Sequence, residues 1–339
     1  MKGLGTLARR IAPAVMLAVC LTGGAAMAQD DFYAGKTIRI LVGFAPGGGY
    51  DLYGRIASEF LPNYIPGKPD VIVENMPGAG GRTAAQYLYA IAPQDGTAIG
   101  VMVQSIAVDS LIGEVQLDAA KFQAIGRFTS NYEFGVSWHE AEAQSFADAQ
   151  QVPVTFASTG AGSASSFVPA MLNDIAGTQF QVIQGYTSGL ELALEQGEAD
   201  AMMIGLPILR AGRQDWLNEG KINFLWQLAN QPHPDYPDVP AVGQLGESEL
   251  EKTMLQLVAD ASDVGRSLFA PPNVPRERIE ILQRAFDAMV NDPEFIRVAA
   301  ERNMELDPAT GEALQAIIDR QMSAGDDVVD LARSYISAR

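Results

Sequence analysis

The stretch GFAPGGGYD, residues 43–51, joins two different sequence patterns. An apolar run at residues 38–42 precedes it and predicts a buried strand, whereas Leu52, Ile56 and Phe60 follow it at helical spacing. Three consecutive glycines at such a junction let the backbone approach a ligand and turn its amides inward. Because a helix N-terminus carries unpaired N–H groups and partial positive charge, the junction favours an anion, and we expect it to hold a carboxylate.

The same kind of junction occurs twice more along the chain. A predicted strand at 71–74 runs into NMPGAGGRT and a helix at 83–91, and a strand at 154–157 runs into STGAGSASSF and another helix. Most glycine loops of this kind only turn the chain. Three of them at strand ends of two lobes are more specific, because such ends face each other across a cleft. The three loops together therefore predict a ligand clamp.

The remaining pattern predicts an α/β fold in two lobes, each a mainly parallel sheet flanked by helices. Residues 104–131 lack regular periodicity and are interpreted as a crossover, and the proline-rich segment QPHPDYPDVPAVGQLG is an extended connection before C-terminal helices. Further strands are predicted at 98–103, 180–183, 201–204 and 222–228. The expected organisation is a first lobe at 29–133, a second lobe at 134–240, and a return to the first lobe at 241–339.

The first 28 residues are expected to be a secretory signal peptide. Lys2, Arg9 and Arg10 precede an apolar run at 11–21 that is too short to span a bilayer, and a small-residue cleavage site ends at Ala28. Both the Sec and the twin-arginine export routes remain open. Cys20, the only cysteine, lies in this segment, so the mature chain is expected to have no disulfide and no cysteine nucleophile.

The composition is that of an ordinary globular protein, with a strongly acidic balance. The 339 residues are 47% hydrophobic and carry a formal charge of −18, which becomes −21 when the three basic residues of the signal peptide are removed. Such a surface repels nucleic acid and anionic lipid. Salt screens exposed charges beyond about 10 Å, so local groups in a cleft can still bind an anion.

Several chemistries are disfavoured by what the chain lacks. The glycine loops match neither the dinucleotide fingerprint nor the phosphate loop, and no G-x-S-x-G nucleophile motif occurs. His139 and His233 are the only histidines, which excludes a multi-histidine metal site. We therefore expect a binding protein with no catalytic residues, no metal and no cofactor.

Individual side chains near the loops each have two open interpretations. Asp51 is expected to accept backbone N–H groups at the start of the first helix, which would fix the loop. Tyr50 and Tyr186 flank loops of the two lobes and either close over a ligand or pack in the core. Arg82 either pairs with the distal carboxylate of a dicarboxylate or is solvated in the first turn of its helix.

The motifs in this order resemble the periplasmic substrate-binding proteins of tripartite tricarboxylate transporters, the Bug family. IRILVGFAPGGGYD, VIVENMPGAGGRTAAQYL, APQDGTAIG, the STGAGSAS loop, GEAD, PDVPAVGQLG and FAPPNVP carry the resemblance, which spans nearly the whole mature chain. It implies a two-lobed, type II-like periplasmic binding protein that closes on its ligand in the interlobe cleft. In this family backbone amides, hydroxyls and bound waters hold the carboxylate, rather than an arginine clamp.

The resemblance also implies partners, location and site. The expected ligand is a mono-, di- or tricarboxylate, delivered to the membrane permease subunits of a tripartite tricarboxylate-type transporter by a protein that is monomeric and periplasmic. Two alternative functions remain: the protein presents its ligand to a sensor kinase, or it is an α/β hydrolase. The expected ligand-binding residues are Phe44, Ala45, Gly47, Gly48, Gly49, Tyr50, Asp51, Pro77, Gly78, Ala79, Gly80, Gly81, Arg82, Ser158, Thr159, Gly160, Ala161, Gly162, Ser163 and Tyr186.

The sequence departs from the family pattern in three places. Arg82 stands where the family often has asparagine, Tyr50 replaces a small residue, and GYTSG at 185–189 replaces the usual YKG. Because these positions lie where ligand choice is set, the identity of the carboxylate does not follow from the resemblance.

Overall fold

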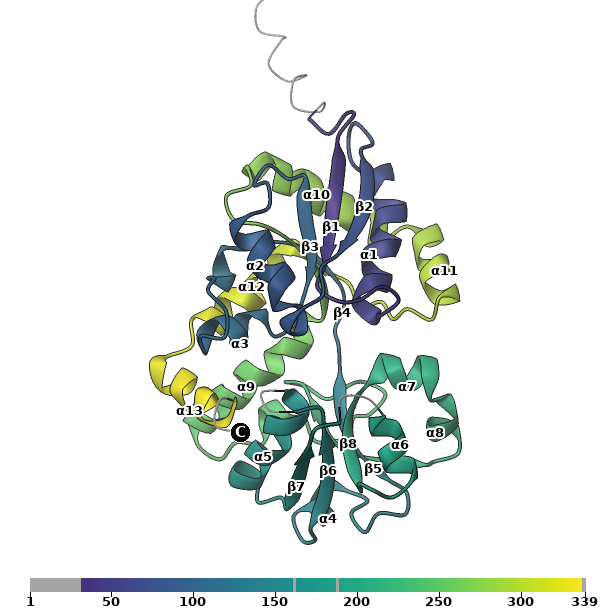
Figure 1. Ribbon diagram of the computed structural model, residues 1–339, viewed down its shortest axis with the longest axis vertical. Coiled ribbons are helices and arrows are strands. Elements are labelled where there is room, and N and C mark those ends of the chain that lie inside the picture. The colour runs from purple at the N-terminus through teal and green to yellow at the C-terminus, as the bar shows by residue number, and fades with distance from the viewer. Residues whose placement is uncertain (1–31, 161–162, 187–188, 337–339) are drawn as a thin grey trace, which may run out of the picture.

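Two α/β units, one above the other in Figure 1, make up the structure, a computed structural model that describes residues 32–160, 163–186 and 189–336. The expected signal peptide lies outside these residues. The first sheet has the strand order β11-β4-β10-β3-β1-β2 and the second the order β7-β6-β8-β5-β9. The predicted two-lobed α/β architecture is therefore confirmed.

Each sheet combines three neighbouring parallel strands with antiparallel pairs beside them. β1 pairs in parallel with β2 and β3, and β6 pairs in parallel with β7 and β8, whereas β10 and β5 run antiparallel to their neighbours. The strands of the first sheet are β1 (Thr37–Val42), β2 (Asp70–Asn75), β3 (Ala98–Met102), β4 (Gln123–Thr129), β10 (Arg266–Ala270) and β11 (Ala309–Thr310). Those of the second are β5 (Glu133–Trp138), β6 (Val154–Ser158), β7 (Phe180–Gln184), β8 (Ala201–Gly205) and β9 (Ile222–Leu228).

Helices cover both sheets, and their apolar faces form the cores. Ile56 of α1 packs with Ile40 of β1 and Phe286 of α10 in the first core, whereas Phe167 of α5 and Trp226 of β9 belong to a core of the second unit. The α-helices are α1 (Gly49–Phe60), α2 (Arg82–Ala90), α3 (Ile106–Leu111), α4 (Phe146–Ala149), α5 (Ala164–Ala176), α6 (Leu190–Glu195), α7 (Leu206–Gly212), α8 (Gln214–Asn218), α9 (Glu249–Val264), α10 (Arg276–Val290), α11 (Pro293–Glu301), α12 (Gly311–Met322) and α13 (Asp326–Ile336). Short 3-10 helices are η1 (Leu61–Asn63), η2 (Ala79–Gly81), η3 (Ala119–Lys121) and η4 (Val242–Gln244).

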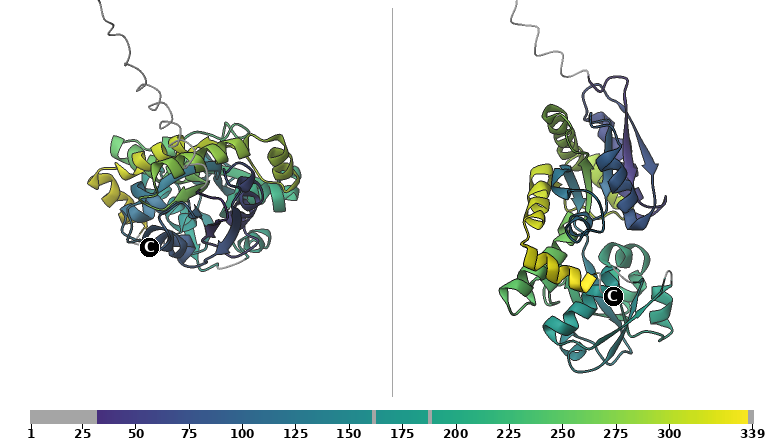
Figure 2. Two further views of the ribbon diagram at one scale, coloured as in Figure 1. Left: turned by 90° about the horizontal axis from the view of Figure 1, so that it is seen from above. Right: turned by 60° about the vertical axis from the view of Figure 1, so that its left-hand side comes forward.

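The C-terminal part of the chain serves both units. β10, α10 and α12 adjoin the first sheet, whereas Val258 of α9 and Val328 of α13 are buried in the same core as Phe167 of α5. Figure 2 shows α12 beside the first unit and α13 reaching down to the second. The lobe boundaries expected from the sequence stay a prediction. No helix of the described part of the chain is long and apolar enough to cross a membrane.

Two expectations about secondary structure were wrong. The segment interpreted as an irregular crossover contains α3 and the strand β4, because its apolar residues are buried on several faces and leave no clear period. β10 was not expected at all: its five residues lie directly after α9, and the short run SLFA is too brief to show alternation.

Two connections between the units touch backbone to backbone. The chain passes from the first sheet to the second at residues 129–133 and returns at 262–266. The Asn131 N–H donates to the Ser262 carbonyl at 2.9 Å, and a Cβ added to Gly265 would lie 2.1 Å from the Thr129 carbonyl oxygen. We call this contact, 129–131 against 262–266, the crossing.

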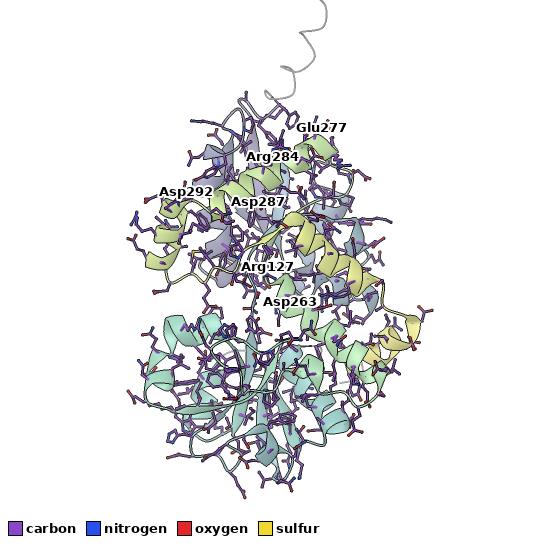
Figure 3. The ribbon with its side chains drawn as sticks, turned by 180° about the vertical axis from the view of Figure 1, so that it is seen from behind. Arg127, Asp263, Glu277, Arg284, Asp287 and Asp292 are labelled. Atoms are coloured by element: carbon purple, nitrogen blue, oxygen red, sulfur yellow. The ribbon has the colours of Figure 1, made fainter. Side chains whose placement is uncertain are left out.

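Arg127 and Asp307 support the crossing from behind. The Arg127 guanidinium donates to the Asp263 carbonyl at 2.8 Å and to the Asp307 carboxylate at 2.9 Å. Figure 3 shows Arg127 and Asp263 at the level where the chain passes between the units. Burial raises the pKa of the Asp263 carboxyl, and the neighbouring charge of Asp260 adds to that effect.

The crossing predicts a strong requirement for glycine at position 265. Gly265 has φ 52°, and alanine there would be strained and would collide with the Thr129 backbone. Gly265→Ala should lower the free energy of unfolding by about 3 kcal/mol. Gly197 also has a positive φ, 70°, but it is surrounded by open space. Gly197→Ala should therefore lower the free energy of unfolding by about 1 kcal/mol. Urea unfolding of both variants checks this, and equal losses would contradict a tight crossing.

Candidate functional site

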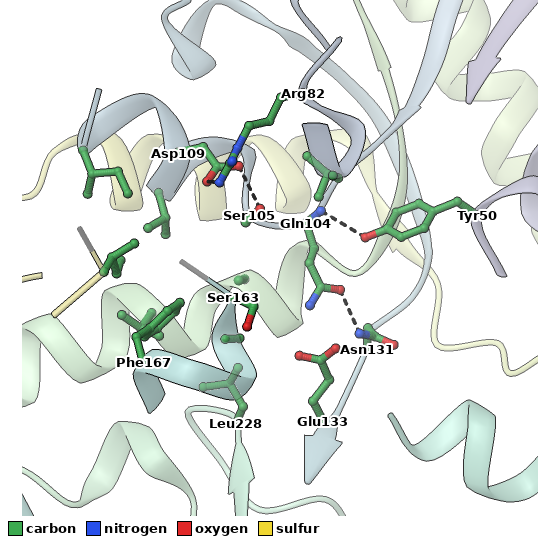
Figure 4. A pocket seen from close by; sticks show the side chains of 18 of the residues that line it. Tyr50, Arg82, Gln104, Ser105, Asp109, Asn131, Glu133, Ser163, Phe167 and Leu228 are labelled. Atoms are coloured by element: carbon green, nitrogen blue, oxygen red, sulfur yellow. Dashed lines mark hydrogen bonds and ion pairs between the residues drawn. The ribbon is translucent and has the colours of Figure 1, made fainter. Parts of the chain in front are cut away.

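A cavity of about 430 Å³ lies between the two units. Its walls come from the loop after β1 and the start of α1, from η2 and the start of α2, from β3 through α3, from the entry to β5, from the start of α5, and from β9, α9, β10 and α13. Elements of both sheets therefore enclose one space (Figure 4). A volume of this size is ordinary for a small-molecule site.

One end of the cavity is polar and is built on the crossing. The Arg266 guanidinium donates to the side-chain oxygen of Gln104 at 3.0 Å and to that of Asn131 at 3.2 Å. The Asn131 amide donates in turn to Gln104 at 2.8 Å (Figure 4). These bonds hold Arg266 in place with neutral partners and leave other N–H groups of its fork available.

Tyr50 supports the same arginine through its ring. Its ring stacks on Phe44, with centroids 4.3 Å apart and an interplanar angle of 13°, and the Arg266 guanidinium carbon lies 3.9 Å from the Tyr50 centroid. The Tyr50 hydroxyl accepts the Gln104 backbone N–H at 3.2 Å. Burial raises the pKa of Tyr50, so the phenol stays neutral at physiological pH. Phe44, Tyr50 and Arg266 form a stack at the wall of the cavity.

Glu133 is the acidic residue of the polar end. Its carboxylate lies below Gln104 and Asn131 in Figure 4. Burial raises the pKa of the Glu133 carboxyl, against the opposing charge of Arg266 and the hydrogen bond with Asn131. Among the described residues, no carboxylate forms an ion pair with the Arg266 guanidinium, which donates to the amide oxygens of Gln104 and Asn131. Arg266 is therefore a half-buried cation without a bonded counterion.

Arg82 lines the cavity but already has an acidic partner. Its guanidinium donates to Asp109 at 2.8 Å and lies 3.9 Å from Glu114, and the Ser105 hydroxyl donates to the other oxygen of Asp109 at 2.9 Å. Both interpretations of Arg82 from the sequence are thereby modified: it is neither simply solvated nor free. Whether it contacts a ligand stays a prediction.

The first glycine loop is held by Asp51, which is buried with 1% of its surface exposed. Its carboxylate accepts from the Gly47 N–H at 2.8 Å, from the Arg55 side chain at 2.6 Å and from the Asn75 amide at 2.8 Å. Burial alone would raise the pKa of Asp51, but these hydrogen bonds outweigh it and hold that pKa below its ordinary value. Asp51 therefore shapes the loop, as one interpretation of the sequence expected.

Only some glycines of that loop stand where a side chain would not fit. Gly47 has φ 88°, a conformation that favours glycine, whereas a Cβ at Gly48 would meet nothing closer than 3.6 Å. A Cβ at Gly49 would lie 3.9 Å from the Arg266 side chain, which places this helix start beside the polar end. The close approach is at Gly43, where a Cβ would lie 2.7 Å from the Gly81 backbone. The first two loops thus pack on each other.

The hydroxyls of the third loop mostly bond to one another. The Ser165 hydroxyl lies 3.2 Å from that of Ser158 and 2.9 Å from that of Ser163, and it accepts the Thr159 N–H at 3.2 Å. Ser163 donates to the Gly160 carbonyl at 2.7 Å and is the residue directly before α5, where its side chain makes no capping hydrogen bond. Of these residues, Ser163 lines the cavity.

The structure therefore brings only part of the predicted set together. Five predicted residues line the cavity: Phe44, Tyr50, Gly80, Arg82 and Ser163. Thirteen others do not: Ala45, Gly47, Gly48, Gly49, Asp51, Pro77, Gly78, Ala79, Gly81, Ser158, Thr159, Gly160 and Tyr186. Ala161 and Gly162 lie outside the described residues, and the ligand contacts of the whole set stay predictions. Tyr186 packs beside a core of the second unit instead.

Sequence reasoning missed the polar residues at the crossing. Gln104, Asn131, Glu133 and Arg266 belong to no glycine loop, and they come together only because the two connections meet. The one available signal was the short run RSLFA between Gly265 and Pro271, which is typical of a short strand. Among the residues that the structure describes, no three histidine or acidic side chains gather as metal ligands would.

A family profile and two relatives are similar to this chain over most of its length. The sequence profile of a family described as "Tripartite tricarboxylate transporter family receptor" matches residues 65–330. The chain is 23% identical over 305 residues to "UPF0065 protein in gbd 5'region" of Cupriavidus necator, covering 88% of each chain. It is 25% identical over 335 residues to "UPF0065 protein in the TAR-I ttuE-ttuC' intergenic region" of Agrobacterium vitis, covering 91% of this chain and 88% of the relative.

Solved structures share the fold. A TctC solute binding protein from Polaromonas superposes with a TM-score of 0.67 at 19% identity, covering 91% of this chain and 100% of that one. MatC from Rhodopseudomonas palustris with bound malate superposes with a TM-score of 0.61 at 21% identity, covering 87% of this chain and 99% of that one. Another R. palustris protein, with adipate, superposes with a TM-score of 0.62 at 17% identity, covering 88% of this chain and 97% of that one.

The Asp51 network predicts a pH-dependent contribution to stability. Because the folded pKa of Asp51 is lowered, its stabilising effect is present above the unfolded value of about 4 and is lost as pH falls through the folded value. Asp51→Asn should lower the free energy of unfolding by about 2 kcal/mol at pH 7, and the difference from wild type should shrink below pH 4. Denaturant titrations between pH 7 and pH 3.5 measure this. Exposed Asp330→Asn is the control, and a loss at Asp51 that is independent of pH would contradict the account.

Proposed function

The chain belongs to the family of tripartite tricarboxylate transporter receptors, and from this premise we propose that it is a periplasmic solute-binding protein for a small organic carboxylate. The ligand occupies the cavity between the two units. The protein is a monomer that captures the ligand outside the inner membrane and delivers it to the permease subunits of a tripartite tricarboxylate-type transporter. The receptor performs no chemical reaction on the ligand.

One observation carries the carboxylate assignment: Arg266 is a half-buried cation inside the cavity, and among the described residues its hydrogen-bond partners are the neutral amides of Gln104 and Asn131. Removing a charge from water is costly unless an opposite charge compensates it. A ligand carboxylate at Arg266 supplies that charge, and the planar guanidinium matches its two oxygens.

Neighbouring groups strengthen an anion site at the same end. Ser163 and Ala164 place the N-terminus of the 13-residue helix α5 in the wall of the cavity, where partial positive charge favours an anion. Hydrogen bonds to a charged group contribute about 1.5–3 kcal/mol each, and micromolar affinity needs about −8 kcal/mol, so several such groups must act together.

The names of two proteins with the same fold support the ligand class. One was solved with malate and the other with adipate, both small carboxylates. The family description supports delivery to a transporter. The signal peptide expected at residues 1–28 agrees with export to the periplasm.

Carboxylate binding at Arg266 is testable by calorimetry. A screen of mono-, di- and tricarboxylates against the mature protein should find at least one micromolar ligand. Arg266→Gln should weaken that ligand about 10- to 100-fold, the value of a charged hydrogen bond, with little change in melting temperature. Arg276 is exposed and remote from the cavity, so Arg276→Gln should bind like wild type. Binding of sugars or cations with no carboxylate bound would refute the proposal.

Delivery to a permease predicts a transport phenotype. A strain lacking this gene should lose uptake of the radiolabelled ligand at micromolar concentration, and expression of the wild-type chain should restore it. Restoration by Arg276→Gln but not by Arg266→Gln would tie uptake to the cavity. If uptake is unchanged and only ligand-induced transcription is lost, the protein presents its ligand to a sensor instead.

A further inference from the structure

The two ends of the cavity differ in chemistry. Opposite the polar end, the wall is made of aliphatic and aromatic side chains: Val108 of α3, Ile112 directly after α3, Phe167 of α5, Val258 of α9 and Ile336 of α13. Each is at least nine-tenths buried. Figure 4 shows Phe167 on the far side of the cavity from Tyr50 and Asn131. We call these five residues the apolar end.

Among the residues that the structure describes, the cavity wall offers one arginine that is not in an ion pair, Arg266. The charged lining residues are two arginines and two carboxylates, Arg82, Arg266, Asp109 and Glu133, whose formal charges cancel. Asp109 already pairs with Arg82 at 2.8 Å, so that arginine offers little to a second ligand group. Arg266 is the cation that a ligand can neutralise without breaking an ion pair.

A second carboxylate would therefore be placed badly. A chain that extends from Arg266 toward the apolar end would bring a distal carboxylate among valine, isoleucine and phenylalanine side chains. Burying a charge there without a partner is strongly unfavourable. Burying methyl and methylene groups in the same place is favourable, since it removes apolar surface from water on both sides.

We infer that the ligand is an amphipathic monocarboxylate, with its carboxylate at Arg266 and an apolar chain or ring in the apolar end. This inference rests on the proposed function and narrows it, because it excludes tricarboxylates and short dicarboxylates as preferred ligands. The preference for a monocarboxylate comes from the ion pair between Asp109 and Arg82 and from the apolar end. Asp109 acts as a positioning residue that removes Arg82 from ligand binding.

Hexanoate and adipate form a matched pair for the test, because both are six-carbon chains and adipate adds only the distal carboxylate. In calorimetric titrations hexanoate should bind at least tenfold more tightly than adipate. Along the series butanoate, hexanoate and octanoate, affinity should rise about fourfold per methylene, equivalent to 0.8 kcal/mol, until the apolar end is filled. Hexanol, which lacks the carboxylate, should bind at least tenfold more weakly than hexanoate.

Two variants report on the two parts of the argument. Val258→Thr keeps the shape of the side chain but adds a hydroxyl to the apolar end, so it should weaken hexanoate about fivefold or more and leave propionate unchanged. Asp109→Asn removes the closer acidic partner of Arg82 and leaves Glu114 at 3.9 Å, so it should strengthen adipate about tenfold and change hexanoate less than threefold. Retained propionate binding shows that each variant is folded.

The outcomes separate this inference from the proposed function. If adipate, malate or citrate binds more tightly than every monocarboxylate, the inference is wrong and the carboxylate-receptor function stands. If affinity does not rise with chain length, the apolar end is not used and the inference is likewise wrong. If no carboxylate binds at all, the proposed function fails and the inference fails with it.

Discussion

The contact on which the structure depends is the crossing, where 129–131 and 262–266 pass backbone to backbone between the two units. Gly265 has no room for a side chain against the Thr129 carbonyl, so the two connections are held at a fixed separation. Asn131 and Arg266 leave this contact on its cavity side and bond to each other at 3.2 Å. The same constraint that joins the units therefore places the cation of the site.

The net negative charge of the chain disfavours an anionic ligand, whereas the local cation at the cavity wall favours one. The chain carries −18 over its whole length, yet the interior cation Arg266 has amide partners instead of a carboxylate. Long-range repulsion of an anion is screened by salt, whereas an interaction at hydrogen-bond distance in a partly dry cavity is not. Short-range geometry therefore decides the binding preference.

Sequence patterns predicted the architecture well, and part of the residues expected at the site line the cavity. Strand-to-helix junctions such as 43–51 have strong local signals, so the two units and their parallel strands could be predicted. The loops then supplied Phe44, Tyr50 and Ser163 to the cavity, but Asp51 and Ser158 are used to hold loops in shape. Arg266 could not be found from the sequence, because it lies on a strand of five residues and its partner Asn131 is 135 residues away.

The central claim is that a carboxylate binds at Arg266 in the cavity formed at the crossing, and a crystal structure of the complex with hexanoate tests it most directly. The account predicts one carboxylate in the cavity, with an oxygen about 3 Å from the Arg266 guanidinium and the alkyl chain beside Phe167 and Val258. A carboxylate bound only by the backbone of residues 47–49, or a ligand outside the cavity, would contradict it.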